Sequence, residues 1–504
     1  MFLFRIIPLI LIFQNIYSIN QNALEKILIA ENQDTAEERE EIREIVQKAM
    51  SNFVPRKMGR QSLTAKKITE KRVYKGPRNN NTKHLEKINE KINEYTFESD
   101  IMLNLGQAKH IAESLEKGEG RVKRQAIIDK SLFWDVKKPI YYQFDSKLSS
   151  SNIANVRKAI KFWNDNSCLS FQESSTGANR LYLTSAGGCW SYVGKQSSNY
   201  QLVSVGPGCD SLGTACHELA HALGFWHQQS RADRDDYVFI DFSNIQPSLQ
   251  YNFQKMSLKE AQLLGLPYDY GSIMQYWPYS FAIDSSQLTV YAKNQLDENS
   301  LGQREAPAFS DIRMVNTLYN CTQQCSSQLP CKNSGFTDSR NCQKCKCPHY
   351  FSGPLCDGLA QGSAQNCNGA IIKANSTWTS FNGLAGDPNS YSSSNNPTDC
   401  FWHIKAEPGQ KIEMRLTKSL QSSICMEQCP WQSIEINMGK FDVYGWIICC
   451  STYNNKVFTS QSNLIAIRGV LKYNQINFNI EYRAIGQADS SNPTTTSAKP
   501  QTCQ

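Results

Sequence analysis

The chain contains 504 residues, with a formal net charge of +7 and 18 cysteines. This length predicts several domains rather than one. Residues 1–124 hold 22 of the 53 Lys and Arg residues and 17 of the 46 Asp and Glu residues, so the rest of the chain is nearly balanced in charge. We therefore expect no nucleic-acid partner.

Residues 1–18, MFLFRIIPLILIFQNIYS, form a short apolar run with Arg5 near its start and the small residue Ser18 at its end. This pattern is typical of a signal peptide and too short for a membrane span. A buried N-terminal helix is the alternative, and the polar sequence that follows disfavours it. No second apolar stretch is long enough to cross a bilayer. We expect a secreted, extracellular protein without a membrane span.

Residues 19–124 are charged, helix-favouring and free of cysteine, and they end in the basic cluster Arg121-Val122-Lys123-Arg124. An aromatic-rich stretch follows the cluster. A basic cluster alone is common, so its position at this change in composition carries the interpretation. We interpret 19–124 as a pro-segment with solvated helical faces and little core, cleaved between Arg124 and Gln125 by a secretory-pathway convertase.

Residues 125–323 have the composition of a mid-sized globular domain. Alternating β-branched or aromatic residues predict strands at 141–145 and 179–185. Apolar residues at helical spacing predict a helix at 150–167 between them. The stretch 213–225, GTACHELAHALGF, predicts a further helix with a glycine terminator.

Cysteines become dense towards the C-terminal part of the chain, which indicates an oxidising compartment. Residues 324–357 contain six of them, and so short a module must be stapled by disulfides. Residues 367–485 alternate strand-like runs with Gly, Asn and Ser turns, which predicts a small all-β sandwich. The Ser/Thr/Pro-rich end, 486–504, is expected to be a disordered tail. Candidate glycosylation sites are the sequons at Asn80, Asn320 and Asn375.

The most informative motif is His217-Glu218-x-x-His221-x-x-Gly224-x-x-His227. Histidines at i and i+4 lie on one face of a helix, so two imidazoles converge. Gly224 then breaks the helix and allows His227 to return as a third ligand. Three nitrogen ligands leave one Zn²⁺ position open for water, as a catalytic site requires. Glu218 beside that water is the expected general base.

The motif, with YDYGSIMQYWPYSF downstream, resembles the metzincin signature and, more narrowly, the astacin family of nematode type with EGF-like and CUB domains. The resemblance implies an α+β peptidase domain, one zinc ion and a multidomain chain. It also implies that Met274 lies beneath the zinc and that Tyr276 is a mobile ligand that stabilises the oxyanion. The two disulfides implied for this domain are Cys168–Cys321 and Cys189–Cys209.

Astacin pro-segments present an F-x-G-D element whose aspartate occupies the open zinc position. The matching residues here are Phe97-Glu98-Ser99-Asp100, so Asp100 is the implied inhibitory ligand. Ser99 stands where the family has glycine, which restricts the backbone at that position.

The C-terminal modules resemble EGF-like and CUB domains. Polar uncharged residues stand where calcium ligands are expected, namely Gln323, Gln324 and Gln432, so we predict no calcium site. The pairing of the remaining cysteines in the CUB-like region stays open: Cys425, Cys429, Cys449 and Cys450. The disulfides that the resemblance implies are Cys325–Cys342, Cys331–Cys345, Cys347–Cys356 and Cys367–Cys400.

Three residues near the motif depart from expectation. Gln228 replaces a family glutamate that meets the new N-terminal ammonium, and we hypothesise that Gln125 cyclises to an uncharged end that matches it. Gln275 precedes the tyrosine where many members have histidine. Cys216 is expected to be a buried free thiol, with pairing to Cys503 as the alternative. The histidines outside the motif are treated as surface residues: His84, His110, His349 and His403.

Together these features predict a secreted zinc metalloendopeptidase, made as a zymogen, that acts on extracellular proteins such as cuticle or matrix proteins. The alternative is a catalytically silent adhesion or binding protein on the same EGF-like and CUB scaffold. The joint presence of three ligands, a base, the methionine and the tyrosine disfavours it. A serine hydrolase or nucleotide enzyme has no matching motif in the sequence.

Overall fold

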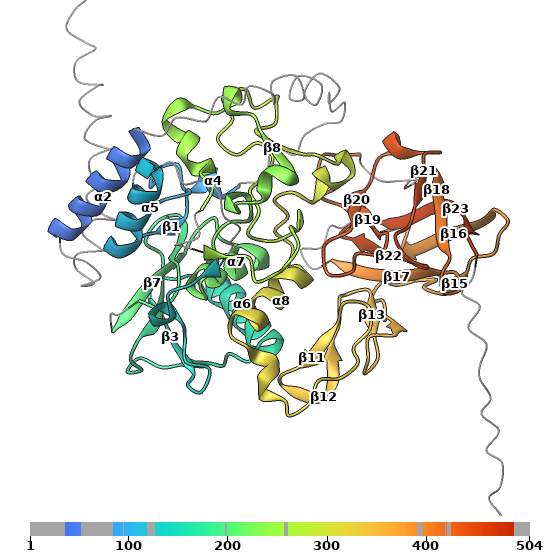
Figure 1. Cartoon of the computed structure of the whole chain (residues 1–504), viewed down its shortest axis with the longest axis horizontal. Helices are drawn as coiled ribbons and strands as arrows, with labels where there is room; N and C mark the ends of the chain where they lie inside the picture. The colour runs from blue at the N-terminus through green and yellow to red at the C-terminus, as the bar shows by residue number, and fades with distance from the viewer. Residues whose placement is uncertain are drawn as a thin grey trace, which may run out of the picture. The chain divides into compact units, whose positions relative to one another are not determined.

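A computed structural model describes residues 36–51, 84–93, 95–117, 126–196, 199–256, 261–390, 397–418, 420 and 425–487. These residues divide into two compact units (Figure 1). The first runs to Gly358 and includes 426–430 and 441–447, and the second contains the other residues from Leu359 onwards. The predicted signal peptide, Asn80, the Arg124–Gln125 cleavage site and Cys503 lie outside the described residues.

The first unit is built on a six-stranded sheet. Neighbouring strands are parallel except β6 and β7, which are antiparallel. The predicted strands at 141–145 and 179–185 correspond to β3 and β5. In spatial order the strands are β1 (Ile101–Met102), β6 (Cys189–Tyr192), β7 (Tyr200–Val205), β5 (Arg180–Thr184), β3 (Ile140–Phe144) and β4 (Phe171–Glu173).

Two long helices position the metal motif. Helix α6 (Ser150–Asn166) packs against α7 (Leu212–Ala222), which also contacts β6 and β7. Ser211 caps α7, because its side chain accepts a hydrogen bond from the Thr214 N–H. Every residue of α7 from Gly213 to Ala222 is buried, so the helix is enclosed on all sides.

A smaller lobe follows α7 and supports the third histidine. In it, β8 (Val238–Ile240) pairs antiparallel with β10 (Val290–Ala292), and helix α8 (Phe309–Leu318) follows. Short 3-10 helices also occur along the first unit. They are η1 (Lys130–Leu132), η2 (Gln228–Ser230), η3 (Arg234–Asp236), η4 (Phe242–Asn244), η5 (Pro247–Phe253), η6 (Gln295–Ser300) and η7 (Cys321–Gln324).

The described part of the predicted pro-segment contributes to the core, contrary to our expectation of solvated helices with little core. It forms α2 (Ala36–Ser51), α4 (Leu85–Ile88), β1 and α5 (Leu105–Lys117). The reason is that β1 extends the main sheet beside β6, which buries the apolar residues around it. Those buried in the main core are Ile42, Leu85, Phe97, Ile101, Leu103, Ala108 and Ile111.

The cysteine-rich segment 324–357 is made of short strands and groups with the first unit. Its hairpin joins β11 (Phe336–Asp338) to β12 (Asn341–Lys346), and β13 (Phe351–Ser352) pairs with β14 (Gly358–Leu359). The Arg340 Nε–H donates to the carbonyl of Asn164 at 2.7 Å, near the end of α6. The structure contains the implied disulfides Cys325–Cys342, Cys331–Cys345 and Cys347–Cys356.

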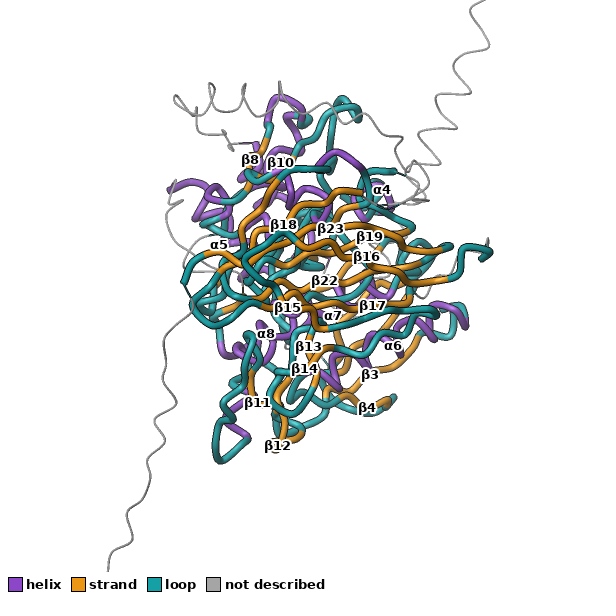
Figure 2. The backbone as a smooth tube through the Cα atoms, turned by 90° about the vertical axis from the view of Figure 1, so that its right-hand side faces the viewer, coloured by secondary structure: helices purple, strands orange, loops and turns teal. Residues whose placement is uncertain are grey.

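The second unit is the predicted all-β sandwich, and its strands are drawn in orange in Figure 2. Burial alternates along the longest strand, β23, as expected for a strand with one face in a core. One sheet has the order β15 (Ile371–Lys373), β17 (Thr398–Lys405), β22 (Leu464–Leu471), β19 (Gln432–Asn437) and β20 (Trp446–Ile448). The other has the order β16 (Thr379–Gly386), β23 (Gln475–Ile485), β18 (Lys411–Lys418) and β21 (Val457–Thr459).

Two points concern the C-terminal part of the chain: the cysteine pairing that the sequence left open, and the position of His403. The Cys367–Cys400 bridge is present, Cys425 pairs with Cys450, and Cys429 and Cys449 are also disulfide-bonded. The expectation that His403 is a surface residue is wrong: it is buried because β17 lies inside its sheet, between β15 and β22.

The backbone conformation of Gly224, between His221 and His227, can be tested by substitution. Its φ is +99°, and an added Cβ would lie 2.6 Å from Ile127 Cδ1. Gly187 also has a positive φ, +84°, but an added Cβ there meets nothing within 4 Å. We expect Gly224→Ala to lower the free energy of unfolding by more than Gly187→Ala, whose backbone strain alone costs about 1–3 kcal/mol. Chemical denaturation measures both, and equal losses would contradict the packing argument.

Candidate metal centre and active site

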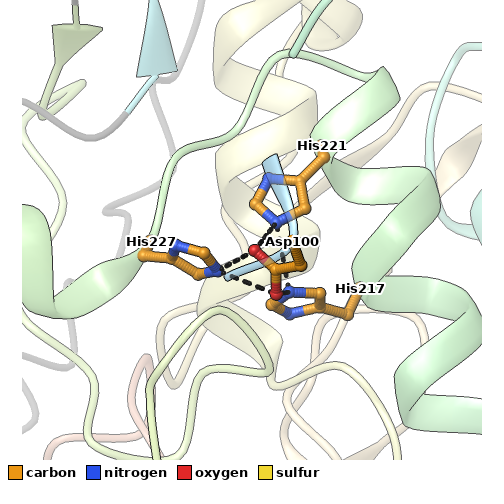
Figure 3. Close-up of side chains that lie close together, drawn as sticks. All are labelled: Asp100, His217, His221 and His227. Atoms are coloured by element: carbon orange, nitrogen blue, oxygen red, sulfur yellow. Dashed lines mark hydrogen bonds and ion pairs between the residues drawn. The ribbon is translucent and has the colours of Figure 1, made fainter. Parts of the chain in front are cut away.

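Three histidine rings converge at one point in the first unit (Figure 3). His217 and His221 come from one face of α7, and His227 follows the turn at Gly224. The Nε2 atoms of His217 and His221 are 3.1 Å apart, and the His227 ring centre is 4.8 Å from that of His221. All three side chains are fully buried. The predicted ligand triad is therefore brought together.

The outer nitrogen of each ring has a hydrogen-bond acceptor. The acceptor of His217 Nδ1 is the Ile273 carbonyl at 2.6 Å, and that of His221 Nδ1 is the Phe225 carbonyl at 2.7 Å. The His227 Nδ1 pairs with the Glu98 carboxylate at 2.6 Å. A carbonyl or an ionised carboxylate only accepts, so each Nδ1 carries the proton and each Nε2 lone pair faces the centre.

The Asp100 carboxylate lies between the three Nε2 atoms, as Figure 3 shows. Its Oδ2 is 3.1 Å from His217 Nε2, and its Oδ1 is 3.1 Å from His227 Nε2 and 3.6 Å from His221 Nε2. Without a metal ion, burial raises the pKa of Asp100, but a protonated His227 and hydrogen bonds with the three rings hold this pKa well below its usual value. The implied inhibitory residue is thus at the site.

This donor set fits a zinc ion. Four ligand atoms lie within 4.8 Å of one another, from Asp100 and the three histidines. With every ring proton on Nδ1, four acceptor atoms face one another, and a bound cation satisfies them together. Three imidazoles and one carboxylate oxygen are ligands that tetrahedral Zn²⁺ takes.

The histidine pKa values agree with this arrangement. Burial lowers the pKa of His217 to about 3 and lowers that of His221 too, so both rings are neutral. Burial also lowers the pKa of His227, but the Asp100 and Glu98 carboxylates raise it on balance to about 9. A metal ion at the centre takes the place of the proton that these carboxylates would otherwise hold on His227.

Glu218 is a buried carboxyl without a hydrogen-bond partner among the residues that the structure describes. Burial and the charge of Asp100 raise its pKa well above the usual value. A carboxyl that adjoins the metal ligands and makes no structural bond of its own can take and return a proton during catalysis.

A turn far downstream in the sequence lies beside the third histidine and carries Met274 and Tyr276. Met274 is fully buried, and its carbonyl accepts from the Gln228 N–H at 2.8 Å. The Tyr276 ring centre is 4.9 Å from that of His227. Its hydroxyl donates to the Glu98 carbonyl at 2.7 Å, so the tyrosine is hydrogen-bonded to the loop that presents Asp100.

Asp311 anchors this turn, and the sequence analysis missed it. Its carboxylate accepts from Ser272 Oγ at 2.6 Å and from the Ile273 N–H at 3.0 Å. Because the carbonyl of the same residue, Ile273, is the acceptor of His217, Asp311 helps to fix that ring through the backbone of one residue. The only signal in the sequence is an acid in the first turn of a helix, which is too common to be diagnostic.

The loop that presents Asp100 has a strained backbone. Phe97 and Ile101 exchange two backbone hydrogen bonds, at 2.8 and 3.0 Å, which close the loop. Glu98 and Ser99 both have positive φ angles, +48° and +73°. The Ser99 carbonyl accepts from Asn89 Nδ2 at 3.0 Å and from Thr96 Oγ1 at 2.9 Å. Serine thus adopts the left-handed conformation that glycine adopts at low cost.

The residues that departed from expectation are all buried. Gln228 is 1% exposed. The Gln275 Oε1 accepts from the Tyr268 hydroxyl at 2.6 Å. Cys216 is a free thiol, and burial raises its pKa well above the usual value. The implied disulfides Cys168–Cys321 and Cys189–Cys209 are present, and the sequon residues Asn320 and Asn375 are exposed.

Comparison with known proteins gives this site a family. Residues 126–320 match the astacin peptidase family. The chain is 62% identical over 480 residues to zinc metalloproteinase nas-28 of Caenorhabditis elegans, covering 95% of this chain and 96% of that one. It is 35% identical to zinc metalloproteinase dpy-31 of Haemonchus contortus, covering 74% and 68% of the two chains.

Among solved structures, the chain is similar to high choriolytic enzyme 1, a hatching enzyme zinc-protease of the medaka fish Oryzias latipes. The identity is 33% and the TM-score 0.36, with 39% of this chain and 98% of that chain covered. The extent and identity of the match to the nematode relative decide the family. The chain belongs to the astacin family and is a zinc metalloendopeptidase.

Proposed function

We propose that this endopeptidase is made as a secreted zymogen. In this form Asp100 occupies the position at the metal that water takes in the active enzyme. The observation that carries the proposal is the contact of its carboxylate with all three imidazoles, at 3.1 to 3.6 Å. Cleavage after Arg124 by a secretory-pathway convertase separates the 19–124 segment from the peptidase, and the departure of Asp100 opens the site to substrate.

In the activated enzyme, His217, His221 and His227 would hold the zinc ion, which would make a water molecule more acidic and polarise the scissile carbonyl. Glu218 would be the base that accepts a proton from the attacking water and returns it to the leaving amine. Once Glu98 has left, the Tyr276 hydroxyl loses its present acceptor and becomes free to donate to the oxyanion. Met274 and the turn around it support the ligands from below.

The disulfides favour secretion. The described residues contain seven disulfide bonds whose two cysteines are identified, such as Cys168–Cys321 across 153 residues. Such bonds persist in oxidising compartments. No helix in the described part of the chain is both long and apolar enough to span a membrane. We propose extracellular proteins as substrates, cuticle or matrix proteins among them.

The inhibitory role of Asp100 is tested in an uncleavable zymogen that carries Arg124→Ala. We expect Asp100→Ala in this background to raise hydrolysis of a quenched peptide at least about tenfold, because the loss of one ligand bond of about 1.4 kcal/mol suffices for that factor. The control is the same Asp100 variant with Arg124 intact: once processed, it yields the wild-type mature sequence and must have wild-type kcat/KM. An uncleavable Asp100 variant as silent as its parent would refute the proposal.

The role of Glu218 is tested in the processed enzyme. Glu218→Gln keeps the side-chain volume but removes the base, so we expect kcat to fall by about 10²- to 10⁴-fold. Zinc content, measured by atomic absorption, should stay at one ion per chain because Glu218 is not among the converging ligands. Peptide cleavage equal to that of the wild type would sink the assignment.

Because the loop is strained, we expect a substitution next to Asp100 to raise the stability of the uncleaved zymogen. Ser99→Gly removes the strain of a left-handed residue, about 1–2 kcal/mol, and a buried hydroxyl without a partner in the described structure. The uncleaved zymogen should therefore unfold at higher temperature and show lower residual activity. Ser99→Ala is the matched control, since it removes the hydroxyl and keeps the strain. Equal effects of the two variants would mean that the backbone strain contributes nothing.

A further inference from the structure

The three metal-facing histidines differ in what holds their outer nitrogen. The acceptors of His217 and His221 are main-chain carbonyls of the peptidase domain, which stay in place after activation. The acceptor of His227 is the Glu98 side chain, which belongs to the predicted pro-segment. One of the three rings is thus oriented by a residue that leaves with the pro-segment.

Glu98 is bound at three points. Its Oε2 is 2.6 Å from His227 Nδ1, and its Oε1 accepts from Ser230 Oγ at 2.5 Å. Its carbonyl accepts from the Tyr276 hydroxyl at 2.7 Å. The side chain is fully buried, so its charge has left water and depends on these two donors. Such a geometry fixes both the carboxylate and the imidazole.

We infer that Glu98 is a positioning residue for the zinc: it orients His227 and strengthens it as a ligand in the zymogen, and activation removes this support. The inference rests on the proposed function, because it takes the 19–124 segment to leave on activation. It concerns metal affinity, whereas the role proposed for Asp100 concerns access of substrate.

The physical basis is the hydrogen bond from the far side of a metal-bound imidazole. A carboxylate acceptor fixes the ring orientation and raises the basicity of the ligating nitrogen, more than a neutral carbonyl does. Loss of such a partner typically costs 10- to 100-fold in metal affinity. After activation the His227 N–H has to pair with water or another group, while the other two rings keep their carbonyls.

A simpler interpretation is that Glu98 only places Asp100, two residues further along the loop. The two interpretations separate in a double-mutant cycle, because an effect transmitted through Asp100 disappears when Asp100 is already alanine. An effect transmitted through His227 persists in that background.

The experiment measures the equilibrium affinity for Zn²⁺, by competition with a chromophoric chelator, on full-length zymogens that carry Arg124→Ala. An equilibrium measurement is used because the rate at which zinc reaches the buried site then does not affect the measured affinity. We expect Glu98→Ala to weaken zinc binding about 10- to 100-fold. The same factor should appear when Asp100→Ala is present. Glu98→Gln, which keeps an acceptor of the same size, should fall between Glu98→Ala and the wild type.

Glu86→Gln is the matched control. Glu86 is another carboxylate of the pro-segment at the peptidase domain, but it bonds to Ser280 and not to a histidine. Its loss should leave the zinc affinity unchanged even if it loosens the pro-segment. Circular dichroism checks that each variant is folded, and Glu98→Gln carries the test if Glu98→Ala is not.

Two results would overturn the inference: zinc affinity unchanged in both Glu98 variants, or a Glu98 effect that vanishes in the Asp100→Ala background. Neither depends on whether Asp100 keeps the zymogen silent. Peptide hydrolysis by the Asp100 variant tests the inhibitory role of Asp100, whereas zinc affinity tests the positioning role of Glu98. One proposal can therefore fail without the other.

Discussion

The orientation of three imidazole rings is the constraint on which the rest of this structure depends. Each ring donates a hydrogen bond from Nδ1 to an oxygen that can only accept. The three Nε2 lone pairs are therefore left to face one buried point. Lone pairs held together without water are costly unless a cation binds them. The site is therefore built for a metal before any metal is considered, and the fold has to supply three acceptors at fixed positions.

The acceptors come from three different parts of the chain. The Phe225 carbonyl follows directly from the end of α7, where Gly224 turns the chain away from the helix. The Ile273 carbonyl belongs to a turn that Asp311 holds from the first turn of α8. The third acceptor, Glu98, comes from the strained loop that also presents Asp100. The end of a helix, a turn held by Asp311 and the strained loop thus meet at one centre.

Local sequence predicted the parts of the site that depend on local geometry. The i, i+4 histidine spacing and the glycine break both follow from nearby residues. The predicted helix 213–225 is observed as 212–222, because Gly224 has a positive φ and the chain has already left the helix there. Such signals survive without knowledge of the tertiary fold.

What the sequence could not give depends on contacts between distant segments. His403 is buried because its strand has neighbours on both sides. The position of a strand within a sheet cannot be predicted from the residues of that strand alone. The charged 19–124 segment contains enough apolar residues to join the core once β1 has a sheet edge to pair with. Glu98 and His227 are 129 residues apart, and only the fold brings them to 2.6 Å.

The loop around Asp100 balances strain against contacts. Two consecutive non-glycine residues with positive φ cost of order 1–2 kcal/mol each. Against this cost stand the hydrogen bonds that Asn89, Thr96 and Tyr276 make to the loop carbonyls, each worth about 1 kcal/mol. Two of these donors, Asn89 and Thr96, lie close to the loop in the sequence, whereas Tyr276 belongs to the distant turn beside His227. The conformation of the loop therefore depends on contacts from both sides, because no single one of these hydrogen bonds offsets the strain of two left-handed residues.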